Sequence, residues 1–166
     1  MLNADDPLVA AVARRIRARI AYFTLGGRGS RVVARHRARG GRAYLVRDGM
    51  LLEANGDAET EIVEVVHVPI TIGGLAQYNV ANALAAAGGA RGTGASIADV
   101  RDGLTGFATS VALSPGRLNL FRLGTRVIIV DFAHNEAGIA AVLDVAEGIA
   151  AGAAARMAPK IGRLSC

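Results

Sequence analysis

Three kinds of polar residue directly follow an apolar run late in the sequence. Val127–Val130 consists of four β-branched residues, and Asp131, His134 and Asn135 come after it. A carboxylate, an imidazole and an amide offer both donors and acceptors for the hydroxyls or phosphates of a small molecule. In α/β proteins ligands bind at the carboxyl ends of strands. The spacing therefore predicts a small-molecule site.

The same polar residues also fit a structural role. Aspartate and asparagine are favoured N-cap residues, because their side-chain oxygens accept hydrogen bonds from the first N–H groups of a helix. A helix is expected to begin near Glu136, so Asp131 and Asn135 are placed to cap it. The residue types alone do not decide between a cap and a ligand contact.

The apolar run that carries these residues predicts a strand. Four consecutive β-branched residues are typical of a strand covered on both faces, as in a parallel sheet. Leu118–Leu123 is a second predicted strand, and it is expected to pair with a strand Arg126–Val130 across the Gly124-Thr125 turn. A helix over Ala137–Ala151 is expected to follow.

Proline and glycine in Ala112–Gly116 break regular structure and predict a boundary between two domains, residues 1–112 and 113–166. The first of these is expected to be a β-rich α/β unit. Its predicted elements, in order, are a helix from Asp6 to Ile20, a strand Ala21–Leu25, a loop rich in glycine and arginine, a hairpin of Arg42–Val46 and Met50–Glu53 around Asp48-Gly49, a strand Glu61–Val68, a helix Gln77–Ala87 and a helix Ser96–Leu104.

A second pair of polar residues lies on the predicted helix Gln77–Ala87. Asn79 and Asn82 are three residues apart, so they share one face of that helix. Asparagine is a modest helix former, and two within one turn indicate either capping or a contact with a ligand.

The overall composition indicates a globular cytoplasmic protein. The chain has 166 residues, of which 52% are apolar and 20% charged, enough for one core. Its one cysteine, Cys166, excludes an intrachain disulfide. No apolar run has the length of a membrane span, and no basic segment with an apolar run opens the sequence, so we expect no membrane partner.

Arginines are concentrated early in the chain, and the formal net charge is +5. The cluster consists of Arg28, Arg31, Arg35, His36, Arg37, Arg39 and Arg42. Such a cluster can neutralise phosphates, which makes a basic nucleic-acid-binding module one alternative function. The cluster contains glycines but no aromatic residue to stack on bases, so we interpret it as a solvated loop or hairpin edge and expect no nucleic-acid partner.

Four segments together resemble the Mur family of ATP-dependent amide ligases. The segment from Asp131, Asp-Phe-Ala-His-Asn-Glu, is similar to the Asp-Tyr-Ala-His-Asn-Pro that opens the C-terminal domain of that family. Asn3-Ala4-Asp5-Asp6-Pro7, Gln77–Ala86 and Ser114-Pro115-Gly116-Arg117-Leu118 resemble three further segments in the same order. The resemblance covers roughly residues 1–150 and is nearest to the Mur-ligase-like half of cyanophycin synthetases.

The resemblance implies a fold, a cofactor and a set of residues. Residues 1–112 would be the second half of the central ATPase domain, and residues 113–166 the first strands and helix of the Rossmann-like C-terminal domain. The family binds ATP and Mg²⁺ and joins a carboxylate to an amine through an acyl phosphate. The positions that match its ATP-binding residues are Asn79, Asn82, Arg117, Asp131, His134 and Asn135. Tyr78 stands where the family has histidine.

The phosphate-binding loop of the family is absent from the sequence. That loop needs a lysine followed by serine or threonine, whereas the one lysine, Lys160, precedes Ile161. We therefore expect no catalytic residue and no metal ligand in this chain. The sequence is interpreted as a fragment of an acid–amine ligase, with the missing half as a separate chain among its expected partners. An inactive remnant that at most binds nucleotide or a partner chain is the alternative. A changed reading frame or a truncated gene model would produce the tail 152–166.

Overall fold

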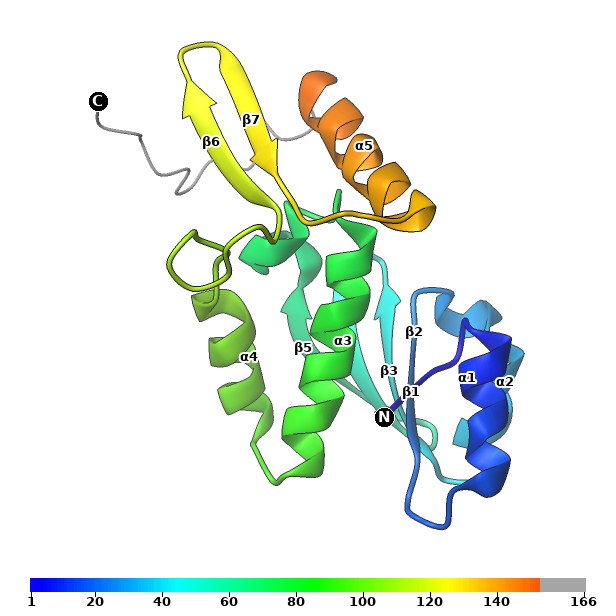
Figure 1. Ribbon diagram of the computed structural model, residues 1–166. Coiled ribbons are helices and arrows are strands. Elements are labelled where there is room, and N and C mark those ends of the chain that lie inside the picture. Colours follow the sequence, from blue (N-terminus) through cyan, green and yellow to red (C-terminus); the bar gives the residue numbers. More distant parts are fainter. Residues whose placement is uncertain (153–166) are drawn as a thin grey trace.

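A five-stranded mixed sheet forms the larger part of the molecule, and a two-stranded sheet stands apart from it (Figure 1). The computed structural model describes residues 1–152. The strands of the larger sheet lie in the order of the sequence, and β1, β2 and β3 are parallel whereas β4 and β5 are antiparallel to their neighbours. They are β1 Leu2–Asn3, β2 Ala21–Thr24, β3 Arg42–Arg47, β4 Met50–Asn55 and β5 Ala58–Glu64.

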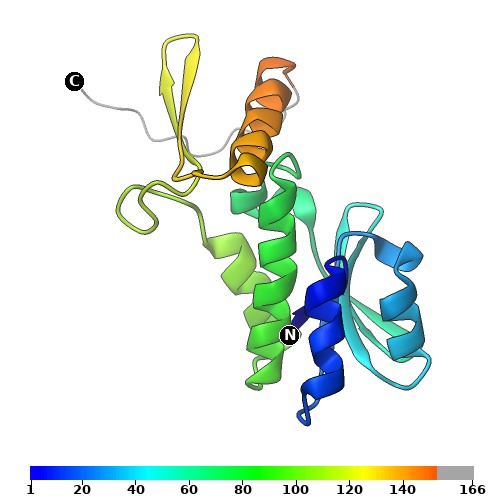
Figure 2. The same ribbon diagram turned by 45° about the vertical axis from the view of Figure 1, so that its right-hand side comes forward.

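Helices cover both faces of this sheet (Figures 1 and 2). Helices α1 (Pro7–Val12) and α2 (Arg31–Arg37) lie on one face, and α3 (Gln77–Gly92) and α4 (Ile97–Gly106) on the other. Short 3₁₀ turns connect the elements: η1 Ala13–Arg15, η2 Gly27–Gly29, η3 Val65–His67 and η4 Pro69–Thr71. The molecule is therefore a layered α/β protein, which agrees with the fold class predicted from the sequence.

Local signals account for several of these elements. Asp48 and Gly49 both have positive φ, 50° and 77°, which is the geometry of the two-residue turn that suits a twisted hairpin. Helix α4 begins with a capping box, in which the Ser96 hydroxyl accepts a bond from the Asp99 N–H and the Asp99 carboxylate accepts one from the Ser96 N–H. These bonds satisfy N–H groups that the start of a helix leaves without partners.

Two hydrophobic cores lie on opposite faces of the sheet, because successive side chains of a strand point to opposite faces. Tyr44 packs into the core beneath α3, whereas its neighbours Ala43 and Leu45 pack into the core beneath α1 and α2. Helix α3 lies very close to β3 at Gly88, where an added Cβ would stand 2.9 Å from the Tyr44 ring. A larger residue at Gly88 would thus push the helix away from the sheet.

A hairpin and a helix complete the described chain. Strands β6 (Asn119–Leu123) and β7 (Arg126–Val130) pair antiparallel, and helix α5 spans Glu136–Ala150. This part packs on the amino end of α3 through a small core of Ala76, Leu118 and Val145. An added Cβ at Gly148 would stand 2.6 Å from Leu75, so α5 also lies close to the chain before α3.

The prediction that β7 is buried on both faces is wrong. Its pairing within residues 1–152 is with β6 alone, and Ile128 and Val130 are 43% and 45% exposed. A run of β-branched residues predicts a strand but does not say how many layers cover it, since that depends on elements elsewhere in the chain. The hairpin itself and the bounds of β7 are as predicted.

Two further predictions need correction. Part of the arginine-rich segment forms helix α2 rather than a loop, because the Ser30 hydroxyl caps its first turn and Val33, 2% exposed, packs into the core. The predicted helix to Ile20 ends at Val12, and η1 carries the chain to Arg15 before it extends.

Smaller differences concern the ends of elements. Strand β5 stops at Glu64, since η3 and η4 turn the chain toward α3, and α3 runs five residues beyond its predicted end at Ala87. Among the described helices, none has the length and apolarity to cross a membrane. The predicted tail 152–166 lies outside the described residues, apart from Gly152.

Candidate functional site

Asp131 joins two stretches of backbone at the end of β7. Its Oδ2 accepts a hydrogen bond from the Leu118 N–H and its Oδ1 accepts one from the Ala133 N–H, both at 2.8 Å. Leu118 has a φ of 49°, an uncommon conformation for a bulky residue, and a bond from its N–H to a carboxylate offsets part of that cost. Each carboxylate oxygen keeps a lone pair, so half-buried Asp131 can still accept a bond from a ligand.

The turn before β6 is fixed by buried Asn119, whose side chain is 3% exposed. Asn119 Oδ1 accepts a bond from the Gly116 N–H at 2.7 Å, and its Nδ2 donates to the Ser114 carbonyl at 3.1 Å. The Phe132 N–H donates to the Gly116 carbonyl at 2.8 Å. Sequence reasoning missed Asn119; its place two residues after the Gly-Arg pair was the available signal. Its bonds hold the backbone that carries Arg117.

Arg117 projects from this turn into solvent. Its side chain is exposed and makes no hydrogen bond or ion pair within residues 1–152. A guanidinium on a fixed turn can contact phosphate or carboxylate oxygens through two N–H groups at once.

His134 and Asn135 follow Asp131 at the start of α5. The Phe132 carbonyl, which can only accept, lies 3.0 Å from His134 Nδ1, so Nδ1 is the donor in this contact. Nε2 makes no hydrogen bond within residues 1–152. Asn135 is the N-cap of α5, and its Oδ1 accepts a bond from the Gly138 N–H at 2.8 Å. The capping alternative is thus confirmed for Asn135 and wrong for Asp131, which bonds elsewhere.

Asn79 and Asn82 lie together in the first turns of α3, as predicted. Asn79 is 9% exposed, and its Nδ2 donates to the Ile70 carbonyl at 2.8 Å. Asn82 is exposed, and its Nδ2 donates to Asn79 Oδ1 at 3.2 Å. Asn79 therefore ties α3 to η4, whereas the Asn82 side-chain oxygen stays available to a ligand.

Tyr78 connects the two groups of predicted residues. It packs against the core of Ala76, Leu118 and Val145, and its buried hydroxyl has no hydrogen-bond partner in the described part of the chain. Burial, and then the charge of Asp131, raises the pKa of Tyr78 to about 12. The amino end of α3 thus lies beside the corner formed by Leu118 and Asp131.

These residues together offer a mixed set of polar groups at one end of the molecule. The polar groups of these residues that have no partner within residues 1–152 are the Arg117 guanidinium, the Asn82 Oδ1, the His134 Nε2 and the Asn135 Nδ2. Such a set suits a ligand with hydroxyls and charged oxygens. Two surface cavities lie elsewhere: one of about 360 Å³ borders α2 and one of about 340 Å³ lies along α1.

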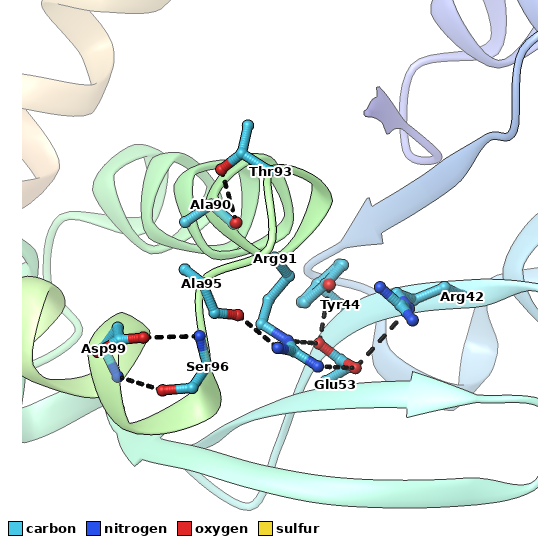
Figure 3. A network of polar contacts seen from close by, with 9 residues as sticks. All are labelled: Arg42, Tyr44, Glu53, Ala90, Arg91, Thr93, Ala95, Ser96 and Asp99. Atoms are coloured by element: carbon cyan, nitrogen blue, oxygen red, sulfur yellow. Dashed lines mark hydrogen bonds and ion pairs between the residues drawn. The ribbon is translucent and has the colours of Figure 1, made fainter.

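A second polar cluster, at the other end of α3, is structural (Figure 3). The Glu53 carboxylate, 7% exposed, accepts bonds from Arg91 Nε at 2.7 Å and from the Tyr44 hydroxyl at 2.9 Å, and Arg42 Nε lies 3.7 Å away. Arg91 also donates to the Ala95 carbonyl. This cluster fastens the carboxyl end of α3 to β3 and β4.

The charges in this cluster shift the pKa of its members. Burial opposes ionisation of Glu53, but the bonds from Arg91 and Tyr44 outweigh it and lower the pKa of Glu53. Burial, and then the bond to Glu53, raises the pKa of Tyr44 to about 12. No local pattern indicates this cluster, since Arg91 and Glu53 are 38 residues apart.

Comparison with known proteins identifies several relatives. No family model matches the chain. Cyanophycin synthetase of Crocosphaera subtropica is 42% identical over 142 residues, and that of a Nostoc species is 44% identical over 142 residues. Cyanophycin synthetase of a Synechocystis species is 41% identical over 144 residues.

The coverage of these alignments is uneven. They include 86% to 87% of this chain but only 16% of each relative. The resemblance to cyanophycin synthetase that was predicted from the sequence is therefore confirmed, for a segment that makes up a small part of the relatives' length.

Proposed function

Because the chain is homologous to one stretch of cyanophycin synthetase, we propose that it supplies the adenosine side of the nucleotide site in an ATP-dependent ligase. The ligase would join a carboxylate to an amine. Residues 1–112 would belong to a central domain of the Mur-ligase type and residues 113–166 to the start of its C-terminal domain.

The proposal rests chiefly on one observation, the meeting of α3 with the Leu118–Asp131 corner. Tyr78 packs against the core that contains Leu118, and the charge of Asp131 contributes to its raised pKa. The helix that carries Asn82 therefore lies next to the turn that carries Arg117. A nucleotide contacted from both elements would have its base and its phosphates recognised by different side chains. The exposed, unpaired state of Arg117 supports this arrangement.

Each residue has a distinct part in the proposal. Asn82 would contact the adenine through its free oxygen, while Asn79 holds α3 in place. Asp131 would accept a bond from the ribose, and Arg117 would bind phosphate oxygens. His134 Nε2 and Asn135 Nδ2 would contribute an acceptor and a donor at the edge of the same site.

Bound ATP would supply the phosphoryl group that activates the carboxylate, with Mg²⁺ to offset its charge. Within this chain the residues bind and orient the nucleotide. A phosphate-binding loop with its lysine would have to come from sequence that this chain does not contain.

The proposal is tested by titrating the 166-residue chain with fluorescent analogues of ATP and of adenosine. Arg117→Ala should weaken ATP binding about tenfold and leave adenosine binding unchanged, because the guanidinium contacts only phosphate. Asn82→Ala should weaken both ligands alike. Arg122→Ala is the matched control, since it removes an exposed arginine of β6 and should change neither.

The outcomes also separate the proposal from an inactive remnant. A remnant that has lost the site would bind neither ligand, and binding that is indifferent to Arg117 and Asn82 would contradict the assignment. In a complete enzyme, Asp131→Ala should raise the Michaelis constant for ATP, and an unchanged constant would exclude the ribose contact.

A further inference from the structure

Charge is distributed very unevenly along the chain. Residues 1–47 contain eleven of the nineteen basic residues and two of the fourteen acidic ones, whereas residues 48–152 contain five basic and twelve acidic. Like charges gathered in one part of a fold repel each other and give no stability there. An acidic partner, or a contact within the molecule, would reduce this repulsion.

Several arginines do have such internal contacts. Arg37 and Arg47 both pair with Glu59, and Arg42 and Arg91 pair with Glu53. Of the other eight arginines in residues 1–47, six lie around one end of the sheet. These six residues, which we call the basic end, are Arg14, Arg15, Arg17, Arg19, Arg35 and Arg39.

The topology explains why these residues gather. Strands β2 and β3 are parallel, so the connections that enter them meet at the same edge of the sheet. Arg14–Arg19 lie in the connection before β2, and Arg35 and Arg39 lie around the end of α2 before β3. In Figure 1 this edge lies at the lower right, whereas β6, β7 and α5 lie at the top.

All six side chains of the basic end are exposed, and none makes a hydrogen bond or ion pair with another residue in the range 1–152. An exposed arginine without a partner is unremarkable alone. Six around one edge create a positive potential that attracts anions over a distance of about 10 Å.

An apolar hollow borders the basic end. Leu8 is 81% exposed and Val12 is 44% exposed on α1, although both are large apolar side chains. They line a cavity of about 340 Å³ together with Ala11, Arg14 and Arg15. Exposed leucine beside unpaired arginine is typical of a surface that a partner covers.

We propose that the basic end and its hollow bind an acidic polypeptide that carries apolar side chains. Carboxylates would pair with the arginines, which can hold them through two N–H groups each, and an apolar side chain would enter the hollow beside Leu8. The surface lies at the opposite edge of the sheet from the nucleotide residues and does not depend on their assignment.

Other partners fit these observations less well. A nucleic acid would use the arginines, but the basic end has no aromatic side chain to stack on bases, and a phosphate backbone has nothing to fill an apolar hollow. A membrane surface would need a longer amphipathic helix than the six residues of α1. A second copy of the chain could offer acidic residues, but these are scattered over β4, β5, α4 and α5.

The test measures binding of labelled peptides to the full chain by fluorescence anisotropy. One peptide consists of glutamates with leucines at helical spacing, and the other has the same charge without leucine. We expect the leucine peptide to bind more tightly, and both to weaken at least tenfold when salt is raised to about 0.5 M. Duplex DNA and anionic phosphatidylserine vesicles are titrated in parallel.

Variants locate the surface. Reversal of Arg14, Arg15, Arg17 and Arg19 to glutamate should abolish binding of both peptides, and Leu8→Ser should remove only the advantage of the leucine peptide. Reversal of Arg122 and Arg126 on the β6–β7 hairpin is the matched control and should change little. Circular dichroism verifies folding, and the milder pair Arg14→Gln and Arg17→Gln replaces the reversal if it unfolds.

The proposal is overturned if neither peptide binds, or if the control reversal weakens binding as much as the other. DNA or vesicles that bind more tightly than the leucine peptide would assign the surface to nucleic acid or lipid instead. Salt-sensitive self-association that Arg14–Arg19 reversal abolishes, without peptide binding, would assign it to a second copy.

Discussion

The sheet unit, residues 1–106, and the hairpin unit, residues 116–150, are held together in different ways. The sheet unit has a core on each face of its sheet, with Tyr44, Leu45, Leu51 and Leu84 fully buried. Within the hairpin unit, Leu118 and Val145 are the deeply buried apolar side chains, while Ile128, Phe132 and Leu143 are well exposed.

Hydrogen bonds take the place of packing in the hairpin unit. Asp131 and Asn119 bond to backbone groups of the loop before β6, and Asn135 caps α5. Such bonds fix geometry but each contributes little net stability, about 1 kcal/mol. The two units therefore have different roles. Packing in the sheet unit supplies the stability, whereas hydrogen bonds in the hairpin unit fix most of the geometry of the candidate site.

The largest expected effect is on the free energy of unfolding, which can be compared for one residue from each unit. Leu84→Ala should lower the free energy of unfolding by about 3 kcal/mol, because it opens a cavity in the core under α3. Ile128→Ala should cost less than about 1 kcal/mol, because the side chain is 43% exposed. Urea unfolding followed by circular dichroism measures both. Equal costs would show that the hairpin unit is as tightly packed as the sheet unit.

A second effect concerns the cluster around Glu53. Arg91→Met leaves a largely buried carboxylate without its main partner and should destabilise the protein by about 2 kcal/mol, less than for a fully buried pair because Arg91 is partly exposed. The exposed Arg122 of the hairpin unit serves as control, and Arg122→Met should have little effect. Combining Glu53→Leu with Arg91→Met should restore part of the lost free energy of unfolding, because it removes the unpaired carboxylate. No recovery in the double variant would mean that Arg91 acts through packing alone.

Two buried tyrosines offer a smaller, matched comparison. Tyr44→Phe removes a hydrogen bond to Glu53 and should cost about 1 kcal/mol. Tyr78→Phe should be neutral or slightly stabilising, because the Tyr78 hydroxyl is buried without a partner. Urea unfolding followed by circular dichroism measures both changes in the free energy of unfolding. A loss on Tyr78→Phe similar to that on Tyr44→Phe would show that the Tyr78 hydroxyl has a partner in solution.

The smallest effect is a dependence on pH. The folded state lowers the pKa of Glu53, so its contribution to stability is fully present above its ordinary value of 4.5 and is lost as pH falls below it. Urea midpoints compared at about pH 6 and about pH 4 should therefore differ less in Arg91→Met than in the unchanged chain. An equal difference in the two proteins would contradict the lowered pKa.

Short-range signals in the sequence predicted the fold well where they acted alone. The Asp48-Gly49 turn and the β6–β7 hairpin are local, and the structure has both. The helix predicted from Ser96 is also present, with Ser96 as its N-cap. Helix α2 was not predicted, because its segment is rich in glycine and arginine and its helical signals are weak. These signals are the cap at Ser30 and one buried apolar residue, Val33. The exposure of β7 was missed, since burial depends on residues distant in the sequence.

The candidate site shows the same limit. The cap at Asn135 was one of two roles considered, and the pairing of Asn79 with Asn82 follows from helical spacing. The bond from Leu118 to Asp131 spans 13 residues and no local pattern indicates it. Sequence reasoning thus named candidate residues but not which of them already bond to the backbone.

The two bonds made by Asp131 also bear on how this site can change over time. One carboxylate fixes the backbone next to Arg117 through Leu118 and the backbone next to His134 through Ala133. A substitution at Asp131 would displace both side chains in a single step, whereas Arg117 or His134 can each be replaced without moving the other. Substitutions at positions 117 and 134 can therefore accumulate independently of each other during evolution, as long as Asp131 is retained.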